Sequence, residues 1–243
     1  MSKLPTAILF DLDDTILAAF GQAPDQWRRV VASFIDKLAP RPPADVVAAI
    51  QTYSRHLWAD AARHKNWRPR IGEARRHIVA KAFAGLAGAA GGSVPPSEVC
   101  EAIADRFNEL HDAELRMFPG AHETLDRLKQ LGVRLALVTN GASGPQRAKV
   151  MRFTLEERFD HIQIEGEHGF GKPEERAYTH AMEALGVEPR ETWMVGDNLE
   201  WEIAAPQRLG IYAIWFDGYG AGLPSGSPIR PDRIIRCLPE LLP

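Results

Sequence analysis

From about residue 118 onward, short apolar runs alternate with segments that have the spacing of amphipathic helices. This pattern constrains the fold strongly, because strands that alternate with helices indicate a parallel sheet with helices on both faces. The segments predicted as strands are Ala7–Phe10, Leu135–Val138, Ile162–Ile164, Trp193–Val195 and Tyr212–Phe216. The helices predicted between them are Ala121–Leu131, Glu174–Leu185 and Leu199–Leu209. The predicted fold class is therefore α/β, with a doubly wound parallel sheet as its core.

The segment between the first two predicted strands has a different pattern. Its apolar residues recur with the i, i+3, i+4, i+7 spacing of helices that bury one face. The segments with this helical pattern are 27–38, 46–57, 72–86 and 96–111. We therefore predict an all-helical insertion of about four helices at residues 17–116, and a sheet domain formed by residues 1–16 and 117–243.

Composition and charge limit the classes of protein to which the chain can belong. It has 243 residues, of which 45% are hydrophobic and 25% are charged, an ordinary globular composition. A formal net charge of −3 offers no basic field for nucleic acid, and two lone cysteines, Cys100 and Cys237, argue against a disulfide framework. Neither a signal peptide nor a run of about 18 apolar residues is apparent. We therefore expect a cytoplasmic protein with no membrane partner.

Three carboxylates occur within four positions directly after the first predicted strand, in Asp11-Leu12-Asp13-Asp14-Thr15. Because side chains alternate along a strand, Asp11 and Asp13 are expected to point the same way. Two converging carboxylates repel each other unless a cation or a shared proton lies between them. The cluster predicts a site for a hard cation such as Mg²⁺, with Asp14 as a solvated turn residue; an Asp-rich turn without a ligand is the alternative.

Candidate site residues also follow three other predicted strands. Thr139-Asn140-Gly141 offers a hydroxyl and backbone N–H groups that can hold an anion, and Lys172 can neutralise a phosphoryl group. Asp197 follows a strand after one glycine, and either Asp197 or Asn198 is expected to cap the next helix. Taken singly, Thr139 is more typical of an ordinary turn and Lys172 of a solvated surface lysine, and Asp197 can be a helix cap. Ligands bind beyond the carboxyl ends of parallel strands, however, which favours a single site.

In this order, the segments Asp11-Leu12-Asp13-Asp14-Thr15, Thr139, Lys172 and Gly196-Asp197 resemble the motifs of the haloacid dehalogenase superfamily, in its phosphatase branch. The resemblance covers about residues 5–16 and 117–243 and implies a Rossmann-like core. The helical insertion resembles that family's cap in position and size. The chain departs from the pattern at Glu202, where many relatives carry Asp, and at Pro206, which is expected to kink or shorten a helix.

The resemblance also implies a role for each residue. Asp11 would be the nucleophile that forms a phosphoryl-enzyme, and Asp13, oriented by Thr15, would donate and then accept a proton. Mg²⁺ would be bound by Asp11, Asp197 and the backbone carbonyl of Asp13. The residues expected to hold the phosphate are Lys172, Thr139 and the backbone N–H groups near Leu12, Asn140 and Gly141. Glu202 retains the charge of the aspartate it replaces and is expected to orient a metal-bound water.

The predicted function is Mg²⁺-dependent hydrolysis of a small phosphorylated metabolite. A carboxylate at Asp13 favours phosphorus over carbon chemistry, because a dehalogenase needs no leaving-group acid at this position. A phosphomutase would keep the same core residues. A phosphoacceptor regulatory domain gathers similar groups, but such domains are about half this length. Basic and aromatic residues in the insertion, such as Arg75-Arg76-His77, are candidates for substrate selection or else solvated helix faces.

Overall fold

The computed structural model describes residues 4–90 and 94–243. Residue contacts divide the chain into two units, one formed by Met1–Phe20 with Arg116–Pro243 and the other by Gly21–Leu115. The insertion was expected to begin at residue 17, but the structure groups residues 17–20 with the sheet unit. The reason is that β2 (Leu17–Ala18) pairs antiparallel with β3 (Arg116–Met117). This pairing holds together the two segments of the chain that connect the sheet unit with the insertion.

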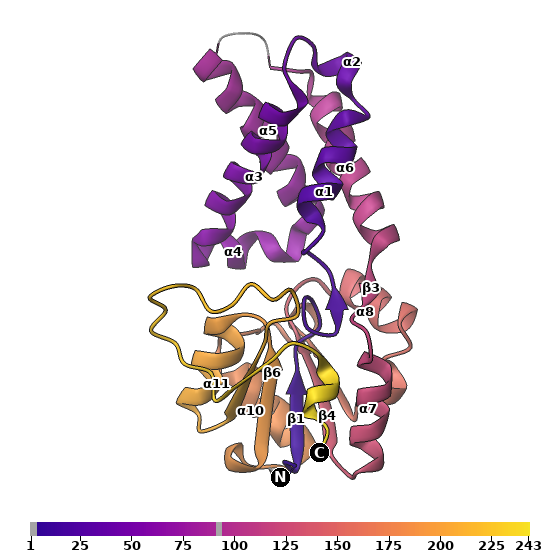
Figure 1. Cartoon of the computed structure of the whole chain (residues 1–243), viewed down its shortest axis with the longest axis vertical. Coiled ribbons are helices and arrows are strands. Elements are labelled where there is room, and N and C mark those ends of the chain that lie inside the picture. The colour runs from indigo at the N-terminus through magenta and orange to yellow at the C-terminus, as the bar shows by residue number, and fades with distance from the viewer. Residues whose placement is uncertain (1–3, 91–93) are drawn as a thin grey trace. The chain divides into compact units, whose positions relative to one another are not determined.

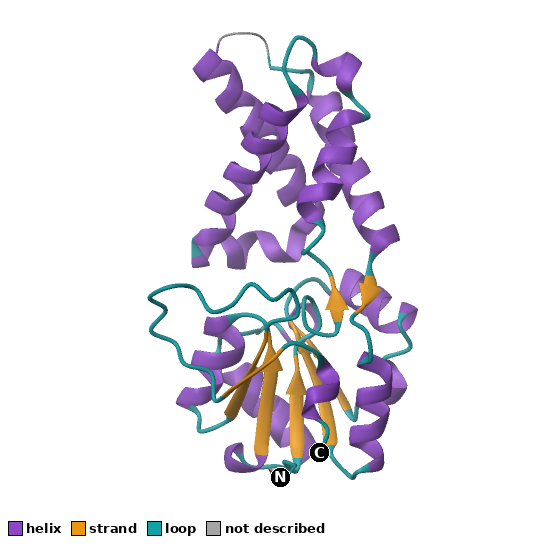
Figure 2. Ribbon diagram, viewed as in Figure 1, coloured by secondary structure: helices purple, strands orange, loops and turns teal. Residues whose placement is uncertain are grey.

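Within the described residues, the sheet unit contains six parallel strands, which confirms the predicted α/β class (Figures 1 and 2). In spatial order they are β5 (His161–Ile164), β4 (Arg134–Thr139), β1 (Ala7–Phe10), β6 (Thr192–Gly196), β7 (Tyr212–Phe216) and β8 (Arg233–Ile235). Each apolar run predicted as a strand lies in this sheet, and β8 adds an edge strand that was not predicted. All four residues of β1 are buried, as expected for a strand covered on both faces.

Helices and short helical turns connect these strands. They are α7 (Ala121–Gln130), α8 (Ser143–Arg152), η2 (Glu156–Arg158), α9 (Glu165–His168), α10 (Glu175–Leu185), η3 (Pro189–Glu191), η4 (Leu199–Ala204), α11 (Ala205–Arg208) and η5 (Leu238–Leu241). Tyr178 and Ala181 of α10 pack in one buried cluster with Leu9 of β1 and Val138 of β4. Apolar packing of α10 against the sheet therefore holds this face of the core in place.

The helix predicted at Leu199–Leu209, which Pro206 was expected to kink or shorten, is divided into two segments in the structure. Residues Leu199–Ala204 form a π-helical segment, and an α-helix begins only at Ala205. Pro206 lies in the first turn of that second helix, where a proline N–H would have no intrahelical partner. The proline therefore marks a helix start within the predicted segment.

The order of the strands brings the candidate site residues together. β1 lies between β4 and β6, and the register pairs Phe10 with both Leu137 and Val195. The carboxyl ends of the three strands therefore meet at one edge of the sheet. This is the point where the strand order reverses, which is the usual position of ligand sites in open α/β sheets.

The second unit is helical. Its helices are α1 (Ala23–Ala32), α2 (Ile35–Leu38), α3 (Pro43–Ala59), α4 (Ala61–Trp67), η1 (Arg68–Arg70), α5 (Ile71–Ala90) and α6 (Ser97–Glu114). The stripe expected as one helix at 27–38 is divided between α1 and α2, and α4 was not predicted. Buried side chains such as Trp27, Ile50, Phe83 and Phe107 form a core of its own. No helix in the described ranges is long and apolar enough to cross a membrane.

Candidate active site

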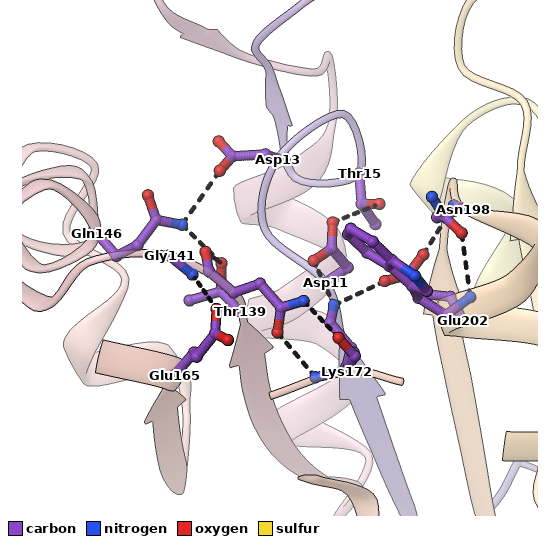
Figure 3. A network of polar contacts seen from close by, with 12 residues as sticks. Asp11, Asp13, Thr15, Thr139, Gly141, Gln146, Glu165, Lys172, Asn198 and Glu202 are labelled. Atoms are coloured by element: carbon purple, nitrogen blue, oxygen red, sulfur yellow. Dashed lines mark hydrogen bonds and ion pairs between the residues drawn. The ribbon is translucent and has the colours of Figure 1, made fainter. Parts of the chain in front are cut away.

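Lys172 is the buried cation of the site (Figure 3). Its side chain is fully buried, and its Nζ lies 2.5 Å from Asp11 Oδ1 and 2.8 Å from Glu202 Oε1. Burial disfavours the charged lysine, but the two carboxylates outweigh burial and raise the pKa of Lys172 above its usual range. Lys172 is thus a fixed positive charge rather than the solvated surface lysine of the alternative reading.

Asn140 positions the backbone of Lys172. Its side-chain amide donates to the Lys172 carbonyl and accepts from the Lys172 N–H, both at 2.8 Å. This double contact ties the end of β4 to the segment that carries the lysine. The neighbouring Gly141 N–H donates to Glu165 Oε2 at 3.0 Å, so in this structure that predicted phosphate donor is engaged by a carboxylate.

Asp11 lies directly beyond β1, and its backbone N–H donates to the Val195 carbonyl of β6 at 3.0 Å. Its carboxylate contacts Lys172 through Oδ1 and accepts a hydrogen bond from Thr15 Oγ1 at 3.3 Å through Oδ2. Thr15 therefore contacts Asp11, whereas it was expected to orient Asp13. Burial raises the pKa of the Asp11 carboxyl, and the charge of Lys172 opposes that rise.

Asp13 points toward α8, which corrects the expectation that it would converge with Asp11 (Figure 3). Lys149 Nζ lies 2.8 Å from both Asp13 oxygens, and Gln146 Nε2 donates to Asp13 Oδ2 at 3.1 Å. The strand ends at Phe10, so the alternation of a strand does not extend to Asp13. Sequence reasoning missed both Gln146 and Lys149, because α8 was not predicted.

Thr139 is also engaged by α8. Its Oγ1 accepts a hydrogen bond from Gln146 Nε2 at 2.6 Å, so one amide group links Thr139 to Asp13. Thr139 and Leu12 are both buried, at the ends of β4 and β1. The hydroxyl and the Asp13 carboxylate therefore lie on the same side of the site.

Asp14 is not the solvated turn residue that was expected. Its φ of +58° lies in the left-handed region, and its Oδ1 accepts from the N–H groups of Ala19 and Phe20 at 2.9 and 2.8 Å. The Tyr219 hydroxyl donates to the same oxygen at 2.7 Å. Asp14 therefore ties the turn after β1 to the backbone that follows β2.

The sequence left open whether Asp197 or Asn198 caps the helix that follows. Asn198 is the cap, since its side chain accepts from the N–H groups of Glu200 and Trp201. The Asp197 carbonyl accepts from Trp215 Nε1 at 2.6 Å, which anchors the backbone beside β7. Among the residues that the structure describes, we find no hydrogen bond or ion pair to the Asp197 carboxylate.

Glu202 turns back from η4 onto the end of β6. Its Oε1 contacts Lys172 and its Oε2 accepts from the Asn198 N–H at 2.8 Å. Gly196 makes this approach possible, since a Cβ at that position would lie 2.0 Å from Glu202 Cγ. Burial raises the pKa of Glu202 to about 7, against the opposing charge of Lys172. The structure thus shows a contact with Lys172 where the sequence suggested an orienter of water.

The carboxylates of the site fit a bound cation. When ionised, Asp11, Asp197 and Glu202 together carry more negative charge than Lys172 balances. Burial first, and then the carboxylates of Glu202 and Asp11, raise the pKa of Asp197 well above its usual range. A cation with oxygen ligands would relieve this repulsion, and carboxylate oxygens are the ligands that Mg²⁺ prefers.

The chain belongs to the haloacid dehalogenase-like hydrolases, whose family profile matches residues 5–210. The glyceraldehyde 3-phosphate phosphatase of Pyrococcus furiosus is 36% identical over 129 residues, which cover 53% of this chain and 54% of that protein. The phosphoserine phosphatase of Thermus thermophilus is 36% identical over 131 residues, which cover 51% and 53%. This chain therefore spans about half the length of these curated relatives.

A solved structure matches over nearly the whole chain. The HAD-hydrolase YfnB from Bacillus subtilis, crystallised bound to magnesium, superposes with a TM-score of 0.73 and 26% identity. The match covers 98% of this chain and 97% of that chain. It confirms the family fold that the motifs predicted.

Proposed function

We propose that this protein is a Mg²⁺-dependent phosphatase that hydrolyses a small phosphorylated metabolite through a phospho-aspartyl intermediate on Asp11. The observation that carries the proposal is the buried Asp11 carboxylate, held by Lys172 at 2.5 Å with Asp13 two residues further on. The curated relatives are named as phosphatases of small phosphorylated molecules, which supports the same class of substrate.

In the proposed reaction, an Asp11 oxygen attacks phosphorus in line while the bond to the leaving oxygen breaks. Asp13 gives its proton to the leaving oxygen, and then takes a proton from the water that attacks the phospho-aspartate. That water releases inorganic phosphate and restores the Asp11 carboxylate. For this role Asp13 must rotate away from Lys149 and Gln146 toward the leaving group.

Positive charge permits an anionic nucleophile to approach an anionic phosphate. Lys172 supplies such a charge next to Asp11, and Thr139 and the backbone N–H groups near Leu12, Asn140 and Gly141 are proposed to hold phosphate oxygens. Asp11, Asp197 and the Asp13 carbonyl would bind Mg²⁺, which supplies further charge neutralisation at the phosphate. Positioning and charge stabilisation account for most of the catalysis of phosphoryl transfer.

The first prediction is that Asp11→Asn abolishes phosphate release while the protein stays folded, because an amide is a poor nucleophile. Release would be measured with glyceraldehyde 3-phosphate, phosphoserine, phosphoglycolate, sugar phosphates and nucleotides, with Mg²⁺ and with a chelator. Asp126→Asn, which removes a half-exposed carboxylate paired with Arg158, is the matched control and should keep full activity.

Each alternative gives a distinct result in this experiment. Near wild-type turnover by Asp11→Asn would show that Asp11 is not the nucleophile. Undiminished turnover in chelator would show that the reaction does not require Mg²⁺. A mutase would convert one sugar phosphate into another with slow net release. A stable phospho-Asp11 without turnover would instead identify a phosphoacceptor module.

A further inference from the structure

Three histidines lie together in the sheet unit, outside the site described above. His161 begins β5, His168 ends α9, and His180 lies in α10. One ring nitrogen from each lies within 4.8 Å of those from the other two. The ring centroids are 5.0 to 6.2 Å apart and the ring planes are inclined by 52 to 74°. The pairs that include His168 therefore meet edge to face, the His161–His180 pair is tilted, and none of the rings stack in parallel.

Two of the rings are oriented through their Nδ1 atoms. His168 Nδ1 lies 3.1 Å from the Ile164 carbonyl, and His180 Nδ1 lies 2.8 Å from Gln163 Oε1. Gln163 is itself fixed, because its Nε2 donates to the Ala177 carbonyl at 2.8 Å and so presents Oε1 to His180. In both histidines Nδ1 therefore faces an acceptor oxygen and donates to it, which leaves Nε2 as the nitrogen that can bind a metal. Metal-binding histidines are commonly held in this way.

The third ring has an unsatisfied nitrogen. His161 Nε2 is buried and has no hydrogen-bond partner among the described residues, which is unusual for a buried polar atom. Burial, and then the neighbouring His180 and His168, lower the pKa of His161. A neutral ring has a lone pair to offer, so an ion at this point would satisfy the buried nitrogen.

We propose that His161, His168 and His180 bind a transition-metal ion such as Zn²⁺, at a second site separate from the carboxylate site. Imidazole nitrogens suit Zn²⁺, whereas Mg²⁺ prefers oxygen ligands, so the two sites differ in chemistry. Zinc–nitrogen bonds of about 2.0–2.1 Å place the three nitrogens of a tetrahedral site about 3.3 Å apart. Binding would draw the rings together by at most about 1.5 Å, with water as the fourth ligand.

The position of the cluster gives the ion a structural role. His168 and His180 lie on either side of the segment 169–174, which carries Lys172. An ion bound by both would link α9 and α10 across this segment and to the edge strand β5. Because the three ligands meet only in the folded chain, binding stabilises the native state. This inference does not depend on the proposed phosphatase activity.

The test uses the full-length protein without a histidine tag, stripped of metal with a chelator and then freed of the chelator. Titration with Co²⁺ should produce the strong visible absorption band of tetrahedral Co²⁺, which saturates at one equivalent of Co²⁺ per chain. Zn²⁺ should displace the bound Co²⁺ and abolish the band, whereas Mg²⁺ should not. Zn²⁺ at about 100 times its Kd should raise the Tm by about 5 °C or more.

Variants assign the ion to its ligands. His161→Gln, His168→Gln and His180→Gln should each lose the absorption band and the rise in Tm, while circular dichroism and Mg²⁺-dependent phosphate release stay unchanged. His122→Gln replaces a histidine that contacts the Phe153 carbonyl at 2.8 Å and should keep the band. Asp197→Asn should keep it as well, because the carboxylate site is not involved.

The opposite results would overturn the proposal. One such result is that no tetrahedral Co²⁺ spectrum appears at one equivalent of Co²⁺. Another is that the wild type and the folded histidine variants bind Co²⁺ with equal affinity. Loss of the band in Asp197→Asn but in none of the three histidine variants would place the ion at the carboxylates instead.

Discussion

Lys172 keeps its positive charge in a fully buried position because two carboxylates contact it. In the proposed reaction the negative charge of the Asp11 carboxylate passes to the phosphoryl oxygens of the phospho-aspartate. Glu202 then remains as the carboxylate beside the lysine. A buried charge without a partner is strongly unfavourable, so Glu202 is a positioning residue that keeps Lys172 charged throughout the proposed cycle.

The second prediction is therefore that Glu202→Gln damages both stability and activity. Glutamine removes the charge and places an NH2 group where one of the two carboxylate oxygens lies, so either Lys172 or the Asn198 N–H loses its acceptor. We expect the free energy of unfolding to fall by about 3 kcal/mol and kcat/KM to fall at least about tenfold. Urea titration and phosphate release measure the two effects.

Glu200→Gln is the matched control for this substitution. Glu200 lies in the same π-helical segment, and its ion pair with Arg208 leaves both side chains more than half exposed. Its removal should change stability by about 0.5 kcal/mol or less. Equal stability and activity in Glu202→Gln and Glu200→Gln would contradict the role given to Glu202.

The third prediction concerns the pH dependence of a surface pair. The hydrogen bonds from Arg147 lower the pKa of Glu167, burial opposes this, and Ser143 adds to the lowering. Because the folded-state pKa is depressed, the stabilisation is present above the unfolded value of about 4.5 and is lost as the pH falls through the folded pKa. We expect Glu167→Gln to cost about 0.5 kcal/mol near pH 7 and less near pH 4, as measured by urea unfolding.

An exposed glutamate elsewhere on the sheet unit provides the comparison. Glu183→Gln on α10 replaces an exposed helix-face glutamate, so it should change stability by about 0.5 kcal/mol or less. A Glu167→Gln effect that grows toward low pH would show that the sign of the linkage is wrong.

At the scale of elements, the sequence predicted those that carry continuous apolar patterns. The runs that became β1, β4, β6 and β7 are buried along nearly their whole length, and such runs are recognised without knowledge of their neighbours. By contrast, α8 buries only Gln146 and Val150 and has no apolar stripe, and β8 buries only Ile235. Neither offers a periodic signal.

The part of the site that was missed depends on these elements. Asp13 and Lys149 are 136 positions apart, and the fold brings them together where α8 lies next to Thr139 and the turn after β1. Similarly, the motif placed Glu202 near the site, but its contact with Lys172 depends on the π-helical segment and on the absence of a side chain at Gly196. Local patterns contain no information about such contacts.

The fourth prediction compares two glycines that have open space around them. Gly85 lies on an exposed face of α5, where a Cβ would contact nothing within 4 Å. Gly132 has equally open space but a φ of +81°, which strains any residue with a side chain. We therefore expect Gly85→Ala to raise the free energy of unfolding by about 0.5–1 kcal/mol and Gly132→Ala to lower it by about 1 kcal/mol.

Denaturant unfolding followed by circular dichroism measures both substitutions. Since neither new methyl group meets a neighbour, the difference in sign tests backbone conformation alone. A stabilising Gly132→Ala would contradict the left-handed turn after α7.

At the scale of the whole molecule, the chain builds two units that each have a buried core of their own. All residues assigned to the proposed chemistry belong to the sheet unit. In the helical unit, basic residues considered for substrate selection contact partners within the unit itself. Arg76 pairs with Asp105 at 2.8 Å, and Arg75 donates to Asn108 at 2.6 Å. The half-exposed Arg76 therefore fits the interpretation as a solvated helix-face charge, whereas Arg75 is buried within the unit.

The fifth prediction is that the sheet unit folds and reacts without the helical unit. Because Ala18 pairs with Arg116 in β2 and β3, residues 21–115 can be replaced by Asn-Gly to close a short hairpin loop. The bonds from the Ala19 and Phe20 N–H groups to Asp14 would be kept. We expect a folded protein that hydrolyses a simple aryl phosphate within about tenfold of the full chain, but discriminates less among phosphorylated metabolites. Circular dichroism and phosphate release measure these outcomes. A folded but inactive product would show that the helical unit contributes a reacting group, and an unfolded product would show that the sheet unit requires the helices for stability.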